Sequence, residues 1–351
     1  MGTISRQQPT ITKYPTTDAI EMEQLNNAFT LFLSLLVEAI PFLLLGVLLS
    51  SVLLIFIDER WLTSHLPTHP VLGAFAGSCI GFLFPVCECG NVPVARRLIM
   101  QGVPMPVAIG FLMAAPTVNP IVIWSTWIAF HDRPEIVILR VVFSLTIATV
   151  IGCIFSLQTD LQPILQPAMA LSTLRAQPKI STGNSLLDGG DFILGTAGMA
   201  PKRMTQDLIQ PPKRSLRANV NLVVDNVVQE LRELGGVLVL GSAVAAAIQT
   251  LTPRELIVSL GEGPVISIVV MMILAGSISI CSTVDSFFAL SFAATFTSGS
   301  LLAFLVFGPM FDLKSIGLML SIFTPKAIFY LFAIATQLTF LLTLFVNFHV
   351  S

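Results

Sequence analysis

The chain has 351 residues, of which 18 are Lys or Arg and 20 are Asp or Glu, so charged residues make up only 11% of it. A soluble domain carries about 25% charged residues, and hydrophobic residues here reach 54%, which excludes an ordinary soluble protein. The net charge is −2 and no basic stripe lies between aromatic residues, which excludes nucleic-acid binding. The sequence also lacks a GxxxxGKS or GxxxxGKT phosphate loop, so any pumping must use an ion gradient or a partner ATPase.

Residues 1–24 are polar and mixed in charge, unlike a secretory signal peptide, and predict a polar cytoplasmic N-terminus before a retained first span. Seven later stretches contain no charged residue and are long enough to cross the hydrocarbon core of a bilayer. They are 39–57, 98–130, 141–159, 234–253, 263–284, 286–311 and 327–351. The sequence therefore predicts an all-α polytopic protein of the inner or plasma membrane.

The segment around Cys87 and Cys89 is the first candidate binding site. Neighbouring proline and glycine residues predict an unwound backbone, in which residues i and i+2 point the same way. The two thiols would then offer a metal or metalloid site to a soft ligand such as Cu(I), Zn(II) or trivalent arsenic. The alternative is that both cysteines are small packing residues. Glu88 and Asn91 complete the expected substrate-binding segment.

Proline and glycine interrupt the apolar stretches and predict helix breaks, because proline lacks a backbone N–H and glycine allows unusual dihedral angles. The expected breakers are Pro85, Gly90, Pro93, Pro116, Pro120, Gly308 and Pro309. Irregular backbone is tolerated inside a membrane protein where it lines a cavity. We therefore expect half-helices or re-entrant segments at 92–101 and 286–296.

Two blocks of the chain resemble each other on either side of a polar segment, 157–218. This segment contains six Pro, five Gly, seven Lys or Arg and four acidic residues, and predicts a flexible cytoplasmic linker. Residues 38–46 match 233–241 with Glu, Leu and Gly superposed, and residues 111–119 match 304–312, at offsets of 195 (233 less 38) and 193 (304 less 111). The chain is therefore expected to contain two transmembrane repeats, 25–156 and 219–351.

The repeat places Cys281 opposite Cys87, because subtracting the offsets from 281 gives 86 to 88. Cys281, Ser282 and Thr283 are therefore added to the expected substrate-binding residues. Three sulfurs meeting at the repeat interface would suit trivalent arsenic, and two would suffice for a monomethylated form.

Polar and charged residues inside spans are costly and usually face a protein interior or a water path. Those expected to act in coupling or translocation are Glu38, Asn119, Glu233, Asp285, Asp312 and Lys314. For Asp312 and Lys314 the alternative is an ion pair that only holds helices together. Arg140 is expected to reach the membrane interface by snorkelling, and Arg96 and Arg97 are expected to be cytoplasmic anchors.

Each repeat is expected to contain about four spans. They are 28–57, 70–86, 104–130 and 135–156, then 234–252, 264–280, 300–322 and 326–347. With a cytoplasmic N-terminus, twelve Lys and Arg lie inside and four outside, namely Arg60, Arg133, Arg254 and Lys326, so the positive-inside rule favours two cytoplasmic termini. Four spans per repeat would make the repeats parallel and five would make them inverted, and the sequence leaves both open.

Four segments together resemble the family of predicted permeases that includes YraQ and the organoarsenical exporter ArsP. They are Pro-Val-Cys-Glu-Cys-Gly-Asn-Val-Pro-Val-Ala-Arg-Arg (85–97), Phe-Leu-Met-Ala-Ala-Pro-Thr-Val-Asn-Pro (111–120), Cys-Ser-Thr-Val-Asp-Ser-Phe (281–287) and Phe-Leu-Val-Phe-Gly-Pro-Met-Phe-Asp-Leu-Lys (304–314). The resemblance implies a multi-span permease with a duplicated core. It also implies that some relatives export trivalent organoarsenicals and others copper or zinc.

The function that these features predict is a permease, not an enzyme, that exports a soft thiophilic solute by alternating access, with possible proton coupling and no cofactor. The alternatives are a permease or passive channel for an unrelated small solute, or a membrane thiol-redox protein. The redox alternative is disfavoured because the cysteine pair lacks CxxC spacing. The expected partners are the transported solute and the lipid bilayer, and the oligomeric state stays open.

Overall fold

The computed structural model describes residues 17–56, 66–67, 69–84, 87–157, 164–166, 216–251 and 263–349. The regular elements in these ranges are helices. One isolated antiparallel β-bridge pairs Leu165 with Phe323. Five helical stretches are long and apolar enough to cross a membrane, which confirms the predicted all-α polytopic membrane fold. They are Leu25–Val52, Pro134–Ser156, Val223–Thr250, Ser298–Met319 and Pro325–His349. Most of the predicted linker lies outside the described residues.

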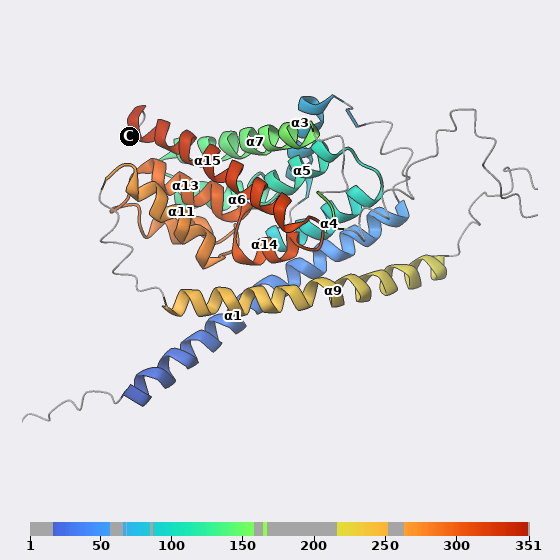
Figure 1. The fold of residues 1–351 in the computed structure, drawn as a ribbon, viewed down its shortest axis with the longest axis horizontal. Coiled ribbons are helices and arrows are strands. Elements are labelled where there is room, and N and C mark those ends of the chain that lie inside the picture. Colours follow the sequence, from blue (N-terminus) through green and yellow to red (C-terminus); the bar gives the residue numbers. More distant parts are fainter. Residues whose placement is uncertain are drawn as a thin grey trace, which may run out of the picture.

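The described helices follow a similar order in the two halves of the chain (Figure 1). The first half contains α1 (Thr17–Phe56), α3 (Pro70–Ile80) with the 3-10 turn η1 (Gly81–Leu83), α4 (Glu88–Met100), α5 (Met105–Ala114), α6 (Pro120–Ala129) and α7 (Pro134–Ser156). The second half contains α9 (Leu216–Leu251), α11 (Ile266–Ile278), α12 (Asp285–Leu290), α13 (Ser298–Met310), α14 (Leu313–Met319) and α15 (Pro325–His349).

Several of the eight expected spans are shorter or divided in the structure. The stretch 104–130 is divided into α5 and α6, and 300–322 into α13 and α14. Helix α3 has 11 residues and α11 has 13, whereas about 20 are needed to cross a bilayer. After each of them the chain turns into α4 or α12, so each half contains a short hairpin that begins and ends at the same end of the bundle.

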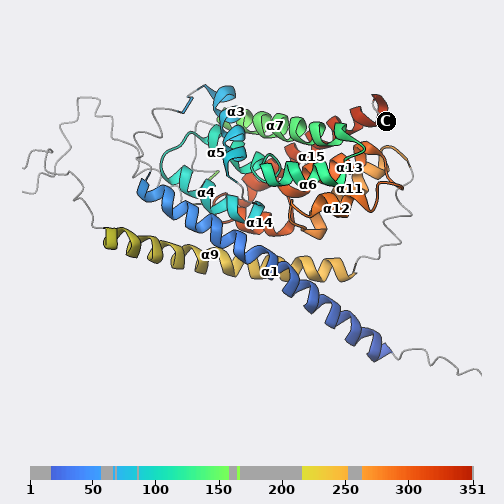
Figure 2. The same cartoon turned by 180° about the vertical axis from the view of Figure 1, so that it is seen from behind.

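The long helices α1 and α9 pack against each other and run antiparallel (Figures 1 and 2). Near one end, Ser50 on α1 donates a hydrogen bond to Glu230 on α9. Near the other, Leu35 packs with Ala245 and Ala246. The long helices of the two halves therefore point in opposite directions, and the internal repeat itself stays a prediction.

The two ends of the bundle carry different parts of the chain. The beginning of α1 and the end of α15 lie at one end, whereas the end of α7 and the beginning of α9 lie at the other (Figure 1). The cytoplasmic location of the linker and of both termini stays a prediction, because residues 1–16 and most of the linker lie outside the described residues.

Candidate functional site

The tip of the first hairpin lies between η1 and α4. Cys87 is the N-cap of α4 with an extended backbone (φ −80°, ψ −178°), and Cys89 is already in the first helical turn. The expectation of an unwound segment with breaks at Gly90 and Pro93 is wrong, because α4 continues through both residues. Pro93 withholds only the N–H that would reach the carbonyl of Cys89, a cost that a helix buried in protein can bear. Pro85 lies outside the described residues.

Close helix packing at Gly90 requires a glycine at position 46. A Cβ atom on Gly46 of α1 would lie 2.2 Å from the carbonyl oxygen of Gly90, so the two backbones are in direct contact. In the second half, a Cβ atom on Gly241 of α9 would lie 3.3 Å from the Cα of Lys314 on α14. The glycines of the repeated Glu–Gly blocks therefore allow α1 and α9 to approach the elements that carry the candidate site.

Replacing Gly46 by Ala is expected to destabilise the protein by about 1–3 kcal/mol, because the new methyl group must displace the backbone of α4. Gly236 is the matched control, since a Cβ atom there meets no atom within 4 Å. Thermal unfolding of the detergent-solubilised variants checks this. Equal unfolding temperatures for Gly46→Ala and Gly236→Ala would contradict the close contact.

The two hairpin tips bring cysteines from both halves of the chain together. The Sγ atoms of Cys87 and Cys281 and a carboxylate oxygen of Glu88 all lie within 4.8 Å of one another, and the three residues are buried. The Cys87 thiol also interacts with the thiol of Cys89. Thr283 donates a hydrogen bond to the Cys281 sulfur at 3.5 Å. We call Cys87, Glu88, Cys89 and Cys281 the thiol cluster.

The tip of the second hairpin is held in an unusual conformation. Ser279, which ends α11, has a left-handed backbone with φ of 52°, which is uncommon for a residue other than glycine. Its Oγ accepts a hydrogen bond from the N–H of Leu313 at 3.2 Å, and Gln249 donates to the carbonyl of Ile278. The buried Ser282 hydroxyl has no hydrogen-bond partner within the described ranges. The turn that presents Cys281 is therefore fixed by α9 and α14.

Lys314, the second residue of α14, lies beside the thiol cluster with 1% of its surface exposed. The groups that act on it electrostatically are Asp312, Cys89, Glu88 and Glu38. Within the described ranges the direct ion pairs are Arg96–Glu233 and Arg140–Asp285, so the alternative of a direct Asp312–Lys314 ion pair is not observed. Both carboxylate oxygens of Glu88 are buried and have no hydrogen-bond partner among the described residues. The centre of the protein therefore has more acidic groups and thiols than cations.

Asn119 and Asp312 occupy corresponding positions as helix caps. Asn119 begins α6, and its Oδ1 accepts hydrogen bonds from the backbone N–H groups of Ile121 and Val122. Asp312 begins α14, and its Oδ1 accepts from the N–H of Ser315 at 2.6 Å. The second carboxylate oxygen of Asp312 is buried and has no hydrogen-bond partner in the part of the chain that the structure describes. Capping therefore explains both residue types, and only Asp312 has an oxygen left for another ligand.

The chain breaks inside each divided helix lie close to the predicted ones. Pro116 lies in the turn after α5, and Pro120 is the first residue of α6. Gly308 and Pro309, in contrast, lie inside the last turn of α13, which ends at Met310. The second break comes later than expected because the capping box at the start of α14 fixes the position at which the new helix begins.

A second polar cluster lies on the other side of the second hairpin. Arg140 of α7 is 1% exposed, and its two terminal nitrogens donate to the carboxylate of Asp285 at 2.5 and 3.1 Å. One of them also donates to the hydroxyls of Thr126 at 2.8 Å and Ser286 at 2.9 Å. The expected snorkelling of Arg140 is therefore wrong, because its counter-ion is inside the protein. Its position within an otherwise apolar helix was the sequence signal that could have identified it.

The two glutamates of the repeated blocks have different surroundings. Glu233 accepts a hydrogen bond from Arg96 at 2.8 Å, and 46% of its side chain is exposed. Glu38 is half-buried and acts electrostatically on Lys314 and Cys281. Only Glu38 therefore belongs to the surroundings of the thiol cluster. Asn91 lies behind the cluster and donates to the carbonyl of Leu112 at 2.8 Å.

Two sulfurs and one carboxylate that converge in a buried space form a donor set for a soft or borderline ion, because thiolates select Cu(I), Zn(II) and similar species. A third sulfur, from Cys89, is adjacent. The unpaired carboxylate oxygens favour a cation or an electrophilic centre over an anion.

Known proteins resemble the chain over most of its length. A sequence model of the ArsP_1 family, described as predicted permease, matches residues 24–348. The UPF0718 protein YcgR of Bacillus subtilis (strain 168) is 35% identical over 308 residues, covering 88% of this chain and 92% of YcgR. A putative two-component membrane permease complex subunit of Streptococcus mutans is 31% identical over 298 residues, covering 85% and 87%. No solved structure matches. The chain therefore belongs to this predicted permease family.

Proposed function

We propose that this member of the predicted permease family is a secondary transporter that exports a soft, thiophilic solute by alternating access. The solute class is a trivalent organoarsenical or a related metal or metalloid species. The observation that carries the proposal is the buried meeting of Cys87, Glu88 and Cys281, which come from opposite halves of the chain. A site between two halves can be exposed to one side of the membrane and then to the other as the halves move.

The chemistry of the thiol cluster supports this solute class. Cys87 and Cys281 supply the two sulfurs that a monomethylated trivalent arsenic centre needs, and the thiol of Cys89 interacts with that of Cys87. No described residue forms a hydrogen bond with either carboxylate oxygen of Glu88, and a buried carboxylate is costly without a proton or a cation. An oxyanion such as arsenate would add negative charge to this acidic centre and is disfavoured.

The hairpins suggest how access alternates. The α3–α4 hairpin begins and ends at the linker end of the bundle, whereas the α11–α12 hairpin begins and ends at the other end (Figures 1 and 2). Glu88 of the first hairpin faces Lys314, and Asp285 of the second is paired with Arg140. Small movements of the two hairpins in turn would therefore open the thiol cluster from opposite ends.

Growth of an arsenic- and metal-sensitive bacterial host tests the proposal. Cells that express the wild-type protein are compared on methylarsenite, arsenite, copper and zinc with cells that express Cys87→Ser or Cys281→Ser. Wild-type protein is expected to protect against at least one of them, and each variant to lose that protection at an unchanged membrane level. Cys153→Ser is the matched control, because Cys153 lies on α7 away from the thiol cluster.

Two results would contradict the proposal in different ways. Protection that survives in both serine variants would exclude the thiols as the binding groups. If the wild-type protein protects against none of the four solutes, it would still belong to the permease family, but its solute would be an unrelated small molecule.

A further inference from the structure

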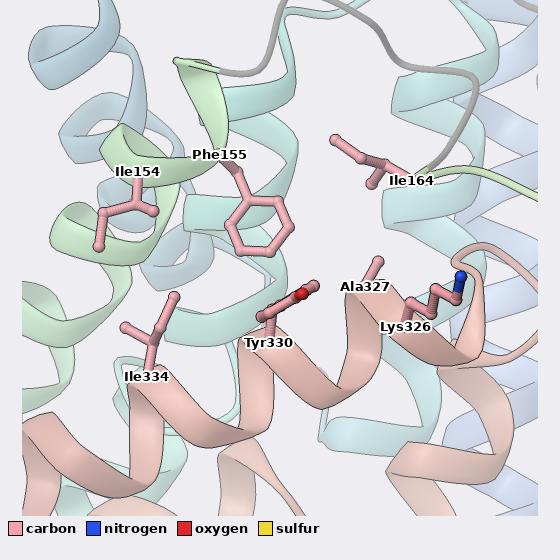
Figure 3. Close-up of a pocket in the computed structure, with 7 residues that line it drawn as sticks. All are labelled: Ile154, Phe155, Ile164, Lys326, Ala327, Tyr330 and Ile334. Carbon is pink, nitrogen blue, oxygen red and sulfur yellow. The ribbon is translucent and has the colours of Figure 1, made fainter.

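A pocket lies between the end of α7 and the beginning of α15, away from the thiol cluster (Figure 3). Its volume is about 300 Å³. The residues that line it are Ile154, Phe155, Ile164, Lys326, Ala327, Tyr330 and Ile334. In Figure 3 the aromatic rings of Phe155 and Tyr330 face the same space, and Lys326 stands at its edge.

The lining combines apolar walls with positive charge. Its single charged residue is Lys326, which is exposed and forms no ion pair with a described residue. The first turn of α15 adds the partial positive charge of a helix N-terminus. Tyr330 offers a phenolic hydroxyl as a hydrogen-bond donor. The pocket is therefore complementary to a molecule with an apolar part and an anionic head.

The position of the pocket indicates the source of such a molecule. It is formed by the last turn of α7 and the first three turns of α15, two of the helices that are long and apolar enough to span a membrane. The ends of such helices lie at the level of the lipid head groups, where Lys and Tyr are typical anchors. A lipid of the surrounding bilayer reaches this depth without leaving the membrane.

We propose that this pocket is a binding site for an anionic phospholipid. The acyl chain lies against Ile154, Phe155 and Ile334, and the phosphate accepts hydrogen bonds from Lys326 and Tyr330. The lipid thereby links α7 to α15 beside the start of the linker. At this place two backbone hydrogen bonds join the segments. The N–H of Thr324 donates to the carbonyl of Ile164 at 2.8 Å, and the N–H of Gln166 donates to the carbonyl of Ile322 at 2.9 Å.

Lipid titration of the delipidated full-length protein in detergent tests the site. Phosphatidylglycerol is expected to raise the unfolding temperature in a saturable way, and phosphatidylcholine with the same chains is expected to have little effect. Lys326→Gln should weaken phosphatidylglycerol binding about fivefold, because a lysine near a lipid surface contributes about that factor. Lys326→Arg should retain binding. Arg133→Gln, an exposed charge at the start of α7, is the matched control.

A further variant and a further ligand separate the parts of the proposal. Ile334→Trp, which fills the pocket, should abolish the lipid effect even though the charge remains. Inorganic phosphate should not replace the lipid, and stabilisation by phosphate alone would assign the site to a soluble anion instead. The proposal is overturned if phosphatidylglycerol and phosphatidylcholine stabilise equally, or if Lys326→Gln and Ile334→Trp respond like the wild type.

Discussion

Replacing Arg140 by Met is expected to destabilise the protein by about 3–5 kcal/mol, the usual cost of leaving one partner of a buried ion pair without the other. Asp285 would keep its carboxylate in a site where both oxygens now accept hydrogen bonds from Arg140. The measurement is the amount of folded, monodisperse protein after detergent extraction, together with its unfolding temperature. Arg133→Met is the control, because Arg133 is exposed at the start of the same helix.

The double variant Arg140→Met with Asp285→Leu shows what the pair contributes. Apolar residues of similar volume often replace a buried ion pair without loss of stability. Thr126 and Ser286 would still be partners, since their hydroxyls lie 3.0 Å apart. We therefore expect the double variant to recover most of the folded protein that the single variant loses. A double variant as unstable as the single one would contradict the structure's pairing of Arg140 with Asp285.

Transport by the double variant shows whether the Arg140–Asp285 ion pair is only structural or must break during transport. If the pair only holds α7 against α12, a folded double variant should retain the protection that the wild type gives. If the second hairpin must release Arg140 during alternating access, the folded double variant should lose protection. We expect loss, because the pair joins the hairpin that carries Cys281 to a helix that crosses the bundle.

Structural features could be predicted from the sequence where they depend on a residue and its neighbours along the chain. Stretches without charge identified the membrane helices, because a charged side chain in a bilayer is costly. Pro116, Pro120 and Asp312 lie at chain breaks because proline and a capping side chain act on their own neighbours. The cysteines that meet in the centre were also visible, since a repeat offset relates Cys87 to Cys281.

Sequence patterns failed where a residue's role depends on a distant partner. Gly90 resembled a helix breaker, but it lies within α4, where its backbone contacts Gly46, 44 positions earlier (90 less 46). Arg140 resembled an interfacial residue because nothing nearby reveals Asp285 as its partner, 145 positions away. The number of spans was overestimated because α3 and α11, with 11 and 13 residues, are too short to cross a bilayer, which apolar composition alone does not reveal.

Mild oxidation is expected to form a disulfide between Cys87 and Cys281 that joins the two halves of the chain. The test protein carries Cys79→Ala, Cys89→Ser and Cys153→Ala, so that Cys87 and Cys281 are its remaining cysteines. A protease site inserted between residues 180 and 200 allows the halves to be separated after cleavage. The halves should stay together on a non-reducing gel and separate after reduction, because the two sulfurs already lie within 4.8 Å.

A control variant moves the second thiol to another place on the same hairpin. Cys281→Ser with Ser291→Cys places a thiol on an exposed residue just after α12. Its halves should separate with or without reduction. Equal cross-linking of the control and the test protein would indicate random collision and would contradict the meeting of the hairpin tips.

The same cross-link tests the cargo. Methylarsenite that bridges Cys87 and Cys281 would occupy both sulfurs and should protect them from oxidation, whereas arsenate, which lacks affinity for thiols in its oxidised state, should not. Cross-linked protein should fail to protect cells, because the two halves can no longer move apart around the site. If cross-linking is efficient but methylarsenite does not prevent it, the geometry of the thiol cluster is supported and an organoarsenical is excluded as the transported solute. If no cross-link forms in the test protein, the close approach of Cys87 and Cys281 would itself be contradicted.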